Sequence, residues 1–455
     1  MSQCIAAIKR AFLLAAIVGA SAATVACGGG SGEPRIPNSD ELLNNVDDGN
    51  DVPSNIGEPV PFLETDVPVN QRSPIFIDEA KLAVANGPYK SSLLRCAQVS
   101  AQSPCTLGEL PMIGQATTDP TVQDIMNRVV ITHDWAGVRF EQILQRLPSQ
   151  TLRLFKPVTL VYIGSENEYT QYSYDLGSLR IKIDDLWINE TERKAVYSSS
   201  NAPATNAPAS ASADNGLQFE PRIRWMLGAE NVYDGFATVD RQYQQITIAV
   251  GMAIYEFLAY PNNFARADSY GLMVASQYPN DIFNLDNSVP VSQELYLDQN
   301  LTFDSSYLYS LANVHFNGEE LGPGQDSFTA QGAGAEIGAQ GKPSFYSFQS
   351  QLFDTVTLFI LAMAKMNHNV YLDVAMVEKP LGPRVLGCDD YKIGWGVRNR
   401  IAAPKVSARA RFVVEQFIGQ SADTDNFFSN KLGQEVSLPV GFGWCDSQSR
   451  VLPAN

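Results

Sequence analysis

The stretch ITIAVGMAIYEFLAYPNNFAR, residues 246–266, carries the strongest structural signal in this chain, because its apolar residues predict one long helix. We expect this helix from about residue 240 to residue 260. Two other long helices are predicted. One covers residues 348–367, where VTLFILAMA is apolar nearly all round and should be deeply buried, and the other covers residues 406–419 and ends at a glycine.

Shorter elements are predicted before the first of these helices. Asp119 and Pro120 indicate the start of a helix that runs to about Val130, and a second amphipathic helix is expected from Trp135 to Leu147. PVTLVYIG, residues 157–164, predicts a buried strand, and LRIKID, residues 179–184, an alternating one. Helices with a few irregularly placed strands predict an α+β fold, a helix-dominated globular domain with a small sheet.

The remaining segments give weaker signals. A short helix is expected at residues 189–196, and a strand around His315 in NVHF. Residues 198–216 are of low complexity and predict a mobile loop, and GAGAEIG, residues 332–338, predicts a flexible loop. The globular part should cover residues 76–455, a length that allows one elaborate domain or two.

The first 26 residues have the three zones of a secretory signal peptide. Lys9 and Arg10 give the positive start, the short apolar run AFLLAAIVGA follows, and small residues lead to Cys27. The junction TVAC, residues 24–27, resembles the lipobox of bacterial lipoproteins, in which the cysteine is acylated, with palmitate for example, and becomes the new amino terminus. An ordinary cleaved signal beside an unmodified cysteine is the alternative.

The lipobox resemblance implies a location for the chain. In such lipoproteins an aspartate after the cysteine favours retention in the inner membrane, whereas Gly28 follows Cys27 here. The resemblance therefore implies a lipid anchor in the outer membrane, with the domain facing the periplasm or the cell surface. Two or more acyl chains anchor stably where one binds only marginally.

Residues 27–75 join the anchor to the globular part. They are rich in Pro, Gly, Asn and acidic residues, which predicts a flexible acidic linker behind the lipidated Cys27. Removal of the signal with Lys9 and Arg10 changes the formal net charge from −17 to −19. A negative net charge disfavours nucleic acids as partners. The expected partners are therefore the membrane, which the lipid anchor enters, and an unknown protein or glycan.

Four cysteines remain besides the anchor: Cys96, Cys105, Cys388 and Cys445. An even number in an exported chain suggests two disulfides, for which three pairings are possible. We favour the local pairing, Cys96 with Cys105 and Cys388 with Cys445, because each bond then closes one short or medium loop.

The helix quoted first resembles the active-site helix of zincin-like metallopeptidases, which carries the motif HExxH. In that family the two histidines hold zinc and the glutamate activates the zinc-bound water. An alignment of IYEFLAY with this motif places Glu256 and Tyr260 at the histidine positions and Phe257 at the general base. The resemblance implies a zincin-like fold without the catalytic groups, so we expect no bound metal and no cofactor.

Glu256 is the most unusual residue of this helix. Its helical neighbours Ala249, Met252, Ala253 and Tyr260 are apolar or aromatic, so we expect its carboxyl group to have a raised pKa. Tyr260, four residues on, is placed to donate a hydrogen bond to it.

Three histidines are the only other obvious ligands: His133, His315 and His368. His368 follows a predicted helix end, where a histidine usually caps the helix or interacts with its dipole. The acidic pairs at 184–185, 319–320 and 389–390 fit ordinary surface turns.

The favoured hypothesis is a non-catalytic outer-membrane lipoprotein that binds an envelope or extracellular partner. The alternative is a metal-dependent peptidase or hydrolase, a zinc enzyme for instance, with atypical ligands drawn from Glu256, Tyr260, His133 and His368. A structural component of a surface assembly is a third hypothesis.

Overall fold

A computed structural model describes residues 81–97, 105–164, 170–174, 176–189, 191–193, 216–232, 242–264, 289–298, 307–380 and 387–451. The predicted signal peptide, Cys27, the linker and nearly all of the low-complexity segment 198–216 lie outside the described residues. The described part is a mixed helix and sheet structure with two five-stranded sheets, in agreement with an α+β fold. We expected one small sheet, whereas the described residues form two.

Sheet A has the strand order β1-β2-β3-β5-β4. Its central strands β2, β3 and β5 are parallel, and the edge strands β1 and β4 run antiparallel to their neighbours. The predicted strands at 157–164 and 179–184 are confirmed as β3 and β5. The strands are β1 (Lys81–Leu82), β2 (Val129–Ile131), β3 (Leu160–Gly164), β4 (Gln171–Ser173) and β5 (Ser178–Lys182).

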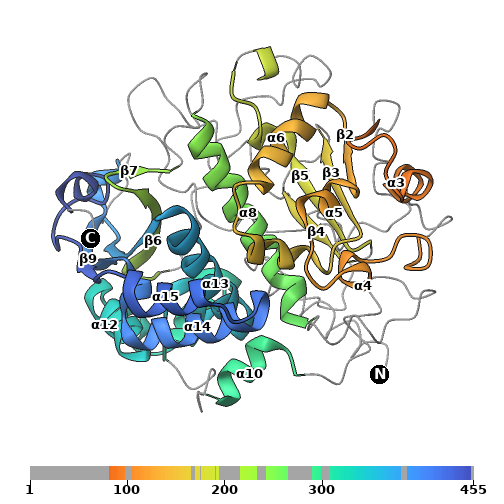
Figure 1. Ribbon diagram of the computed structural model, residues 1–455. Helices are drawn as coiled ribbons and strands as arrows, with labels where there is room; N and C mark the ends of the chain where they lie inside the picture. The colour runs from red at the N-terminus through yellow and green to blue at the C-terminus, as the bar shows by residue number, and fades with distance from the viewer. Residues whose placement is uncertain are drawn as a thin grey trace, which may run out of the picture.

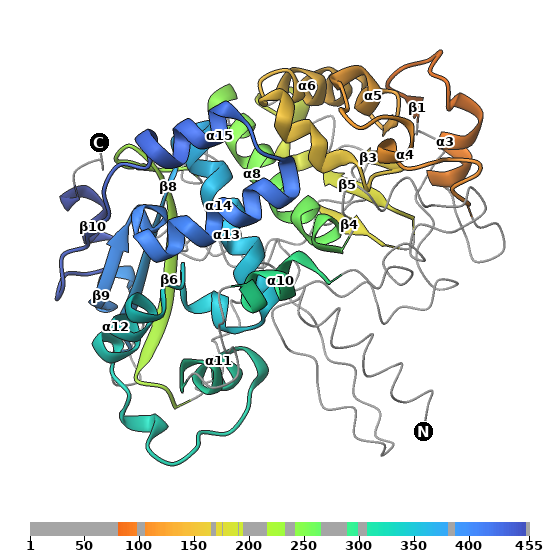
Figure 2. The same cartoon turned by 60° about the horizontal axis from the view of Figure 1, so that its bottom comes forward.

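The two faces of sheet A are covered by different elements, because alternate side chains of a strand point to opposite faces. Val161 and Ile163 belong to the main core, together with Phe140 of helix α6 (Asp134–Leu144). Leu160 and Tyr162 belong to a smaller cluster with α3 (Lys90–Ala97), on the other face. In Figures 1 and 2, α3 lies at the outer side of this sheet.

Sheet B is antiparallel throughout, in the order β10-β9-β8-β6-β7. Its central strands are buried along most of their length. The strands are β6 (Phe219–Leu227), β7 (Glu230–Asn231), β8 (Tyr371–Glu378), β9 (Lys392–Arg398) and β10 (Val436–Ser437). Sequence analysis predicted none of them.

Two long helices lie between the sheets, as Figures 1 and 2 show. The first, α8 (Tyr243–Phe264), packs along the second, α13 (Gln351–His368), and α14 (Pro404–Ile418) packs on α13. All three were predicted, and α13 is deeply buried as expected. The main hydrophobic cluster contains Ile163 of sheet A and Val374 of sheet B, so one continuous core joins the two sheets.

The other helical segments are short and lie around the sheets and the long helices. They are α4 (Ile113–Ala116), α5 (Val122–Met126), α10 (Val291–Asp298), α11 (Tyr307–Asn317), α12 (Ala330–Gln340), α15 (Ala422–Asn426), a π-helix η9 (Phe427–Lys431), and the 3-10 helices η1 (Ser149–Phe155), η2 (Ile183–Asp185), η5 (Gln325–Ser327), η6 (Phe345–Phe348), η7 (Cys388–Asp390), η8 (Arg400–Ala402) and η10 (Asp446–Arg450).

Three local predictions were wrong. The helix expected through Val130 is shorter, because it begins after Thr121 and ends at Met126. The Thr121 side chain accepts from the Asp124 amide in a capping box, and Val129 belongs to strand β2. His315 lies in helix α11 instead of a strand. GAGAEIG forms most of helix α12 instead of a loop, since its small residues let the helix pack closely on β9, where Gly334 lies against Trp395.

Candidate functional site

Helix α8 is the candidate functional element because it carries Glu256 and Tyr260, two of the four predicted site residues, and lies between the two sheets. It continues past the expected end at Tyr260, through Pro261 to Phe264. Most of its residues are buried, as the apolar sequence predicts. Tyr255 and Glu256 are consecutive, so their side chains leave the helix about 100° apart and face different neighbours.

The Tyr255 side meets the end of α13. The Tyr255 hydroxyl is 2.8 Å from Nε2 of His368, and the Asn367 side-chain amide donates to the same hydroxyl at 3.0 Å. That amide also lies 3.3 Å from Oγ1 of Thr151, which connects this group to the 3-10 helix η1. The Tyr255 oxygen accepts from Asn367, and its hydroxyl can donate to His368 Nε2 when the neutral imidazole carries its proton on Nδ1.

His368 therefore does not have the role that the sequence suggested. Burial lowers its pKa to about 4, so the ring is neutral at physiological pH and cannot act as a cation at the helix end. Gly251 makes room for it, since a Cβ at this position would lie 2.8 Å from His368 Nε2. His368 is a packing partner of α8.

The Glu256 side carries the positions of the metallopeptidase motif. Tyr260 is buried and packs edge-on against Phe353 of α13, with ring centroids 6.3 Å apart. Phe257 packs against the main core. Glu256 remains partly accessible to solvent, and burial in apolar surroundings raises its pKa to about 7, in the expected direction. The expected hydrogen bond from Tyr260 to Glu256 does not form between these two described residues.

This set of side chains does not fit a zincin metal centre. A buried tyrosine stands where the second histidine would bind zinc, and a phenyl ring stands where a carboxylate would activate water. His133 lies before α6, with Nδ1 2.9 Å from the Thr132 hydroxyl, and His315 packs against Phe316 and Phe345. Within the described ranges, no three His, Cys, Asp or Glu side chains are grouped so that they could hold a metal ion, so Glu256, His133 and His368 are not brought together.

Two of the three acidic pairs, at 184–185 and 389–390, take part in local contacts, and Glu319 and Glu320 are exposed. Asp184 forms an ion pair with Lys182, and Asp185 accepts from the Thr170 hydroxyl. Asp389 accepts from the backbone amide of Asp446, and Asp390 from that of Gly387.

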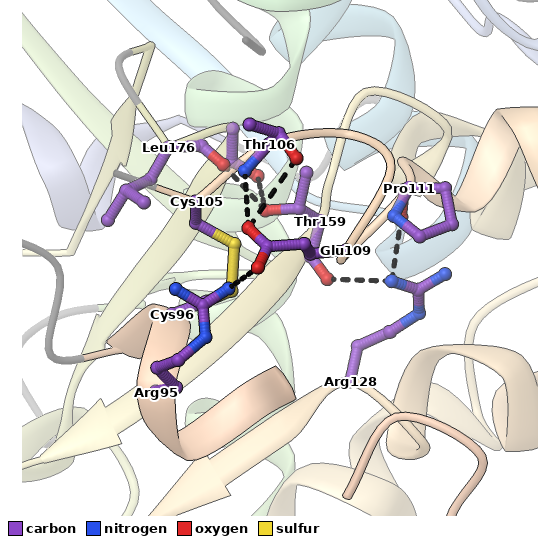
Figure 3. The surroundings of a disulfide bond; sticks show 10 residues. Arg95, Cys96, Cys105, Thr106, Glu109, Pro111, Arg128, Thr159 and Leu176 are labelled. Carbon is purple, nitrogen blue, oxygen red and sulfur yellow. Dashed lines mark hydrogen bonds and ion pairs between the residues drawn. A yellow bond between two sulfur atoms is a disulfide. The ribbon is translucent and has the colours of Figure 1, made fainter. Parts of the chain in front are cut away.

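The predicted disulfides are confirmed, with the local pairing. Cys96 and Cys105 are joined with their Cα atoms 5.4 Å apart, and Cys388 and Cys445 with theirs 5.7 Å apart. Figure 3 shows the first bond beside the ion pair between Arg95 and Glu109, in which two atoms are 2.6 Å apart. The Glu109 carboxylate also accepts from the Thr106 amide, so it fixes the turn that follows Cys105.

Two buried ionic clusters were not predicted. Asp373 of β8 binds Arg224 and Arg398 from the neighbouring strands β6 and β9. Asp354 of α13 binds Lys342 and Arg409, and burial, which raises its pKa, is outweighed by these two cations, so the pKa is lowered. The sequence feature that could have indicated these clusters is a charged residue inside an apolar segment, as in YLDVAMVE. Both clusters join segments that lie far apart in the sequence.

Comparisons with known proteins place this chain in no known group. No family model matches it, and neither the curated proteins nor the solved structures contain a significant match. In the part of the chain that the structure describes, no helix has the combination of length and apolarity needed to span a bilayer.

Proposed function

We propose that this protein is an exported, lipid-anchored protein of the bacterial envelope whose globular domain binds a protein or glycan partner without catalysing a reaction. The pair of disulfides is the observation that supports export of this chain. Disulfides persist in oxidising compartments such as the periplasm and the cell surface, and they are rare in the cytosol. They therefore support the signal-like N-terminus.

The packing of α8 supports a binding function without catalysis. Tyr255 and His368 bind each other, and Tyr260 is buried against Phe353, so these side chains hold helices together. One continuous core and two disulfides give a preorganised body, which lowers the entropy cost of binding a partner.

Lipid anchoring is tested by metabolic labelling with a radioactive or clickable palmitate analogue in a bacterial host. We expect label in the wild-type chain and none in Cys27→Ser. Cys4→Ser is the matched control, because it removes the other cysteine of the leader and should retain the label. An unlabelled wild-type chain, or a labelled Cys27→Ser chain, contradicts anchoring at Cys27.

Partner binding is tested by cross-linking in intact cells that carry the anchored chain. A binding protein should give the same stoichiometric neighbour in repeated experiments, and that neighbour should be displaced by excess purified globular domain. Absence of any reproducible protein neighbour, together with absence of binding to envelope glycans on an array, contradicts this half of the proposal.

One observation favours the enzymatic alternative. A carboxyl group with a pKa of about 7, as at Glu256, suits a general base at neutral pH. Metal analysis of purified protein separates the two functions. Stoichiometric zinc that is lost in Glu256→Ala would support a metal-dependent hydrolase and overturn the non-catalytic proposal.

A further inference from the structure

The two disulfides of this protein differ in how far solvent reaches them. Cys96 and Cys105 are 0% and 6% exposed, and they belong to the hydrophobic cluster between α3 and sheet A. Cys445 is exposed, and its partner Cys388 is only partly buried. A disulfide is broken by a thiolate that must reach one of its sulfur atoms. The fold therefore protects the first bond and leaves the second one accessible.

The residue before Cys445 is fixed by contacts other than the disulfide. Trp444 is 1% exposed and belongs to a hydrophobic cluster with residues of β8 and β9. Its amide donates to the Tyr391 carbonyl at 3.0 Å, and its carbonyl accepts from Arg224 at 2.7 Å. These contacts do not involve the S–S bond, so they keep Cys445 in place when the bond is open.

The residues after the two cysteines are also bound to each other. The Asp446 amide donates to Oδ1 of Asp389 at 2.7 Å. Gly443 lies so close to Asp389 that a Cβ at this position would overlap with it. The Cα atoms of Cys388 and Cys445 are 5.7 Å apart, within the range that a disulfide requires. While these contacts persist, two reduced thiols remain within reach of each other.

We propose that Cys388–Cys445 is an exchangeable disulfide, which an external dithiol opens in the folded protein and a small-molecule disulfide closes again. The bond then controls how firmly the C-terminal segment, residues 438–451, covers sheet B. Arg398 donates to the carbonyl of Val451 in this segment, so the cover supplies an acceptor to a buried cation. The proposal concerns the folded domain and does not depend on the lipid anchor.

The exchange takes place in two steps. A thiolate of the dithiol attacks the sulfur of Cys445, the more exposed residue, and forms a mixed disulfide with it. The bond to Cys388 breaks, and its electron pair leaves on the Cys388 sulfur, which takes up a proton. The second thiol of the reductant then displaces Cys445 and closes a cyclic disulfide. The protein gains two electrons and two protons, and the dithiol loses the same.

Differential alkylation of the full chain tests the exchange. Free thiols are first blocked with N-ethylmaleimide, and the native protein is then treated with dithiothreitol. Newly formed thiols are labelled with isotope-coded iodoacetamide and located by peptide mass spectrometry. We expect label at Cys388 and Cys445 to appear at least about tenfold faster than at Cys96 and Cys105.

Two controls separate accessibility from intrinsic reactivity. In guanidinium chloride, where the fold protects neither bond, both pairs should be labelled at similar rates. When oxidised glutathione replaces dithiothreitol, the pair Cys388 and Cys445 should close again and lose its label. If both bonds open at equal rates in the native protein, or if Cys388–Cys445 opens only together with a loss of the far-UV circular dichroism signal, the proposal is wrong.

Hydrogen exchange of the oxidised and the reduced protein measures the effect on the cover of sheet B. After reduction, we expect amide protection in residues 438–451 to fall on the order of tenfold, because the cross-link no longer limits opening of this segment. Helix α3, which the buried disulfide retains, should keep its protection. Unchanged protection in residues 438–451, or an equal fall in α3, would overturn the control of this cover by the bond.

Discussion

The two sheets of this protein are covered in a similar way but are stabilised by different interactions. Each has one face in the main hydrophobic core and the other face covered by a segment that carries a disulfide. The cover of sheet A is α3 with the Cys96–Cys105 disulfide, and that of sheet B is the C-terminal segment with the Cys388–Cys445 disulfide. The covers differ in what lies beneath them.

Beneath the cover of sheet A, the contacts are mainly apolar. Leu160 and Tyr162 of β3 and Val130 of β2 meet Leu93 and Cys96 of α3. Arg128, which is buried there, donates to the backbone carbonyls of Pro111 and Thr159, as Figure 3 shows.

Beneath the cover of sheet B, ion pairs replace part of the apolar contact. Asp373 lies between Arg224 and Arg398, and both arginines also reach the C-terminal segment. Arg224 donates to the carbonyl of Trp444, and Arg398 to that of Val451. Sheet B therefore depends on its covering segment for hydrogen-bond acceptors as well as for burial.

The largest effect is expected from Asp373→Ala. This change leaves two guanidinium groups, each at most 5% exposed, without their carboxylate. We expect a loss of about 3–5 kcal/mol in the free energy of unfolding, measured with urea at neutral pH. Asp389→Ala removes an exposed carboxylate near the same segment and should cost about 1 kcal/mol or less. Equal losses in the two variants would show that the buried ion pairs of Asp373 stabilise sheet B no more than the exposed carboxylate of Asp389 does.

Removal of each disulfide compares the two covers directly. The bonds close loops with sequence separations of 9 and 57 residues. Loop entropy then predicts losses of about 3 kcal/mol for Cys96→Ala/Cys105→Ala and about 4 kcal/mol for Cys388→Ala/Cys445→Ala. Thermal unfolding of the two double variants measures both. A larger loss from the shorter loop would mean that native-state contacts of α3, and not chain entropy, determine the contribution of that bond.

Gly251→Ala tests the junction between the sheets. The new Cβ would lie 2.8 Å from His368 Nε2, so the imidazole must move away from Tyr255. We expect a loss of about 1–3 kcal/mol by urea unfolding. The control is Gly338→Ala in α12, where the nearest atom is 4.0 Å from the added Cβ, and where alanine should stabilise the helix by up to about 1 kcal/mol. A stabilised Gly251→Ala would show that the Tyr255–His368 contact is dispensable.

The same difference between the sheets explains how much of the fold the sequence predicted. Strands β3 and β5 were recognisable because apolar residues run through them, as in PVTLVYIG. Strands β6, β8 and β9 were not, because FEPRIRWML and YLDVAMVE place Arg224 and Asp373 at buried positions where a sequence pattern expects apolar residues. Each of these charges becomes acceptable only beside a partner from another strand, and a single sequence does not show that partner.

The candidate site was predictable to a similar degree. Helix α8, the raised pKa of Glu256 and both disulfides followed from local sequence. The pairing of Tyr255 with His368 spans a separation of 113 residues, and Gly251 becomes meaningful only once that pairing is known. The expected role of His368 failed for the same reason, since position at a helix end predicts a cation and burial prevents one.

The smallest predicted effect concerns the pH dependence of that pairing. His368 has an ordinary pKa of about 6.5 in the unfolded chain and about 4 in the folded one, because burial disfavours the imidazolium. Its contribution to stability is therefore complete above about pH 6.5 and is lost as pH falls towards 4. Between pH 7 and pH 5.5, we expect the wild type to lose about 1 kcal/mol of the free energy of unfolding relative to His368→Gln, which cannot take up a proton at this position. Urea unfolding of both proteins at the two pH values measures this difference. If both proteins change by the same amount, His368 does not contribute to the pH dependence of stability.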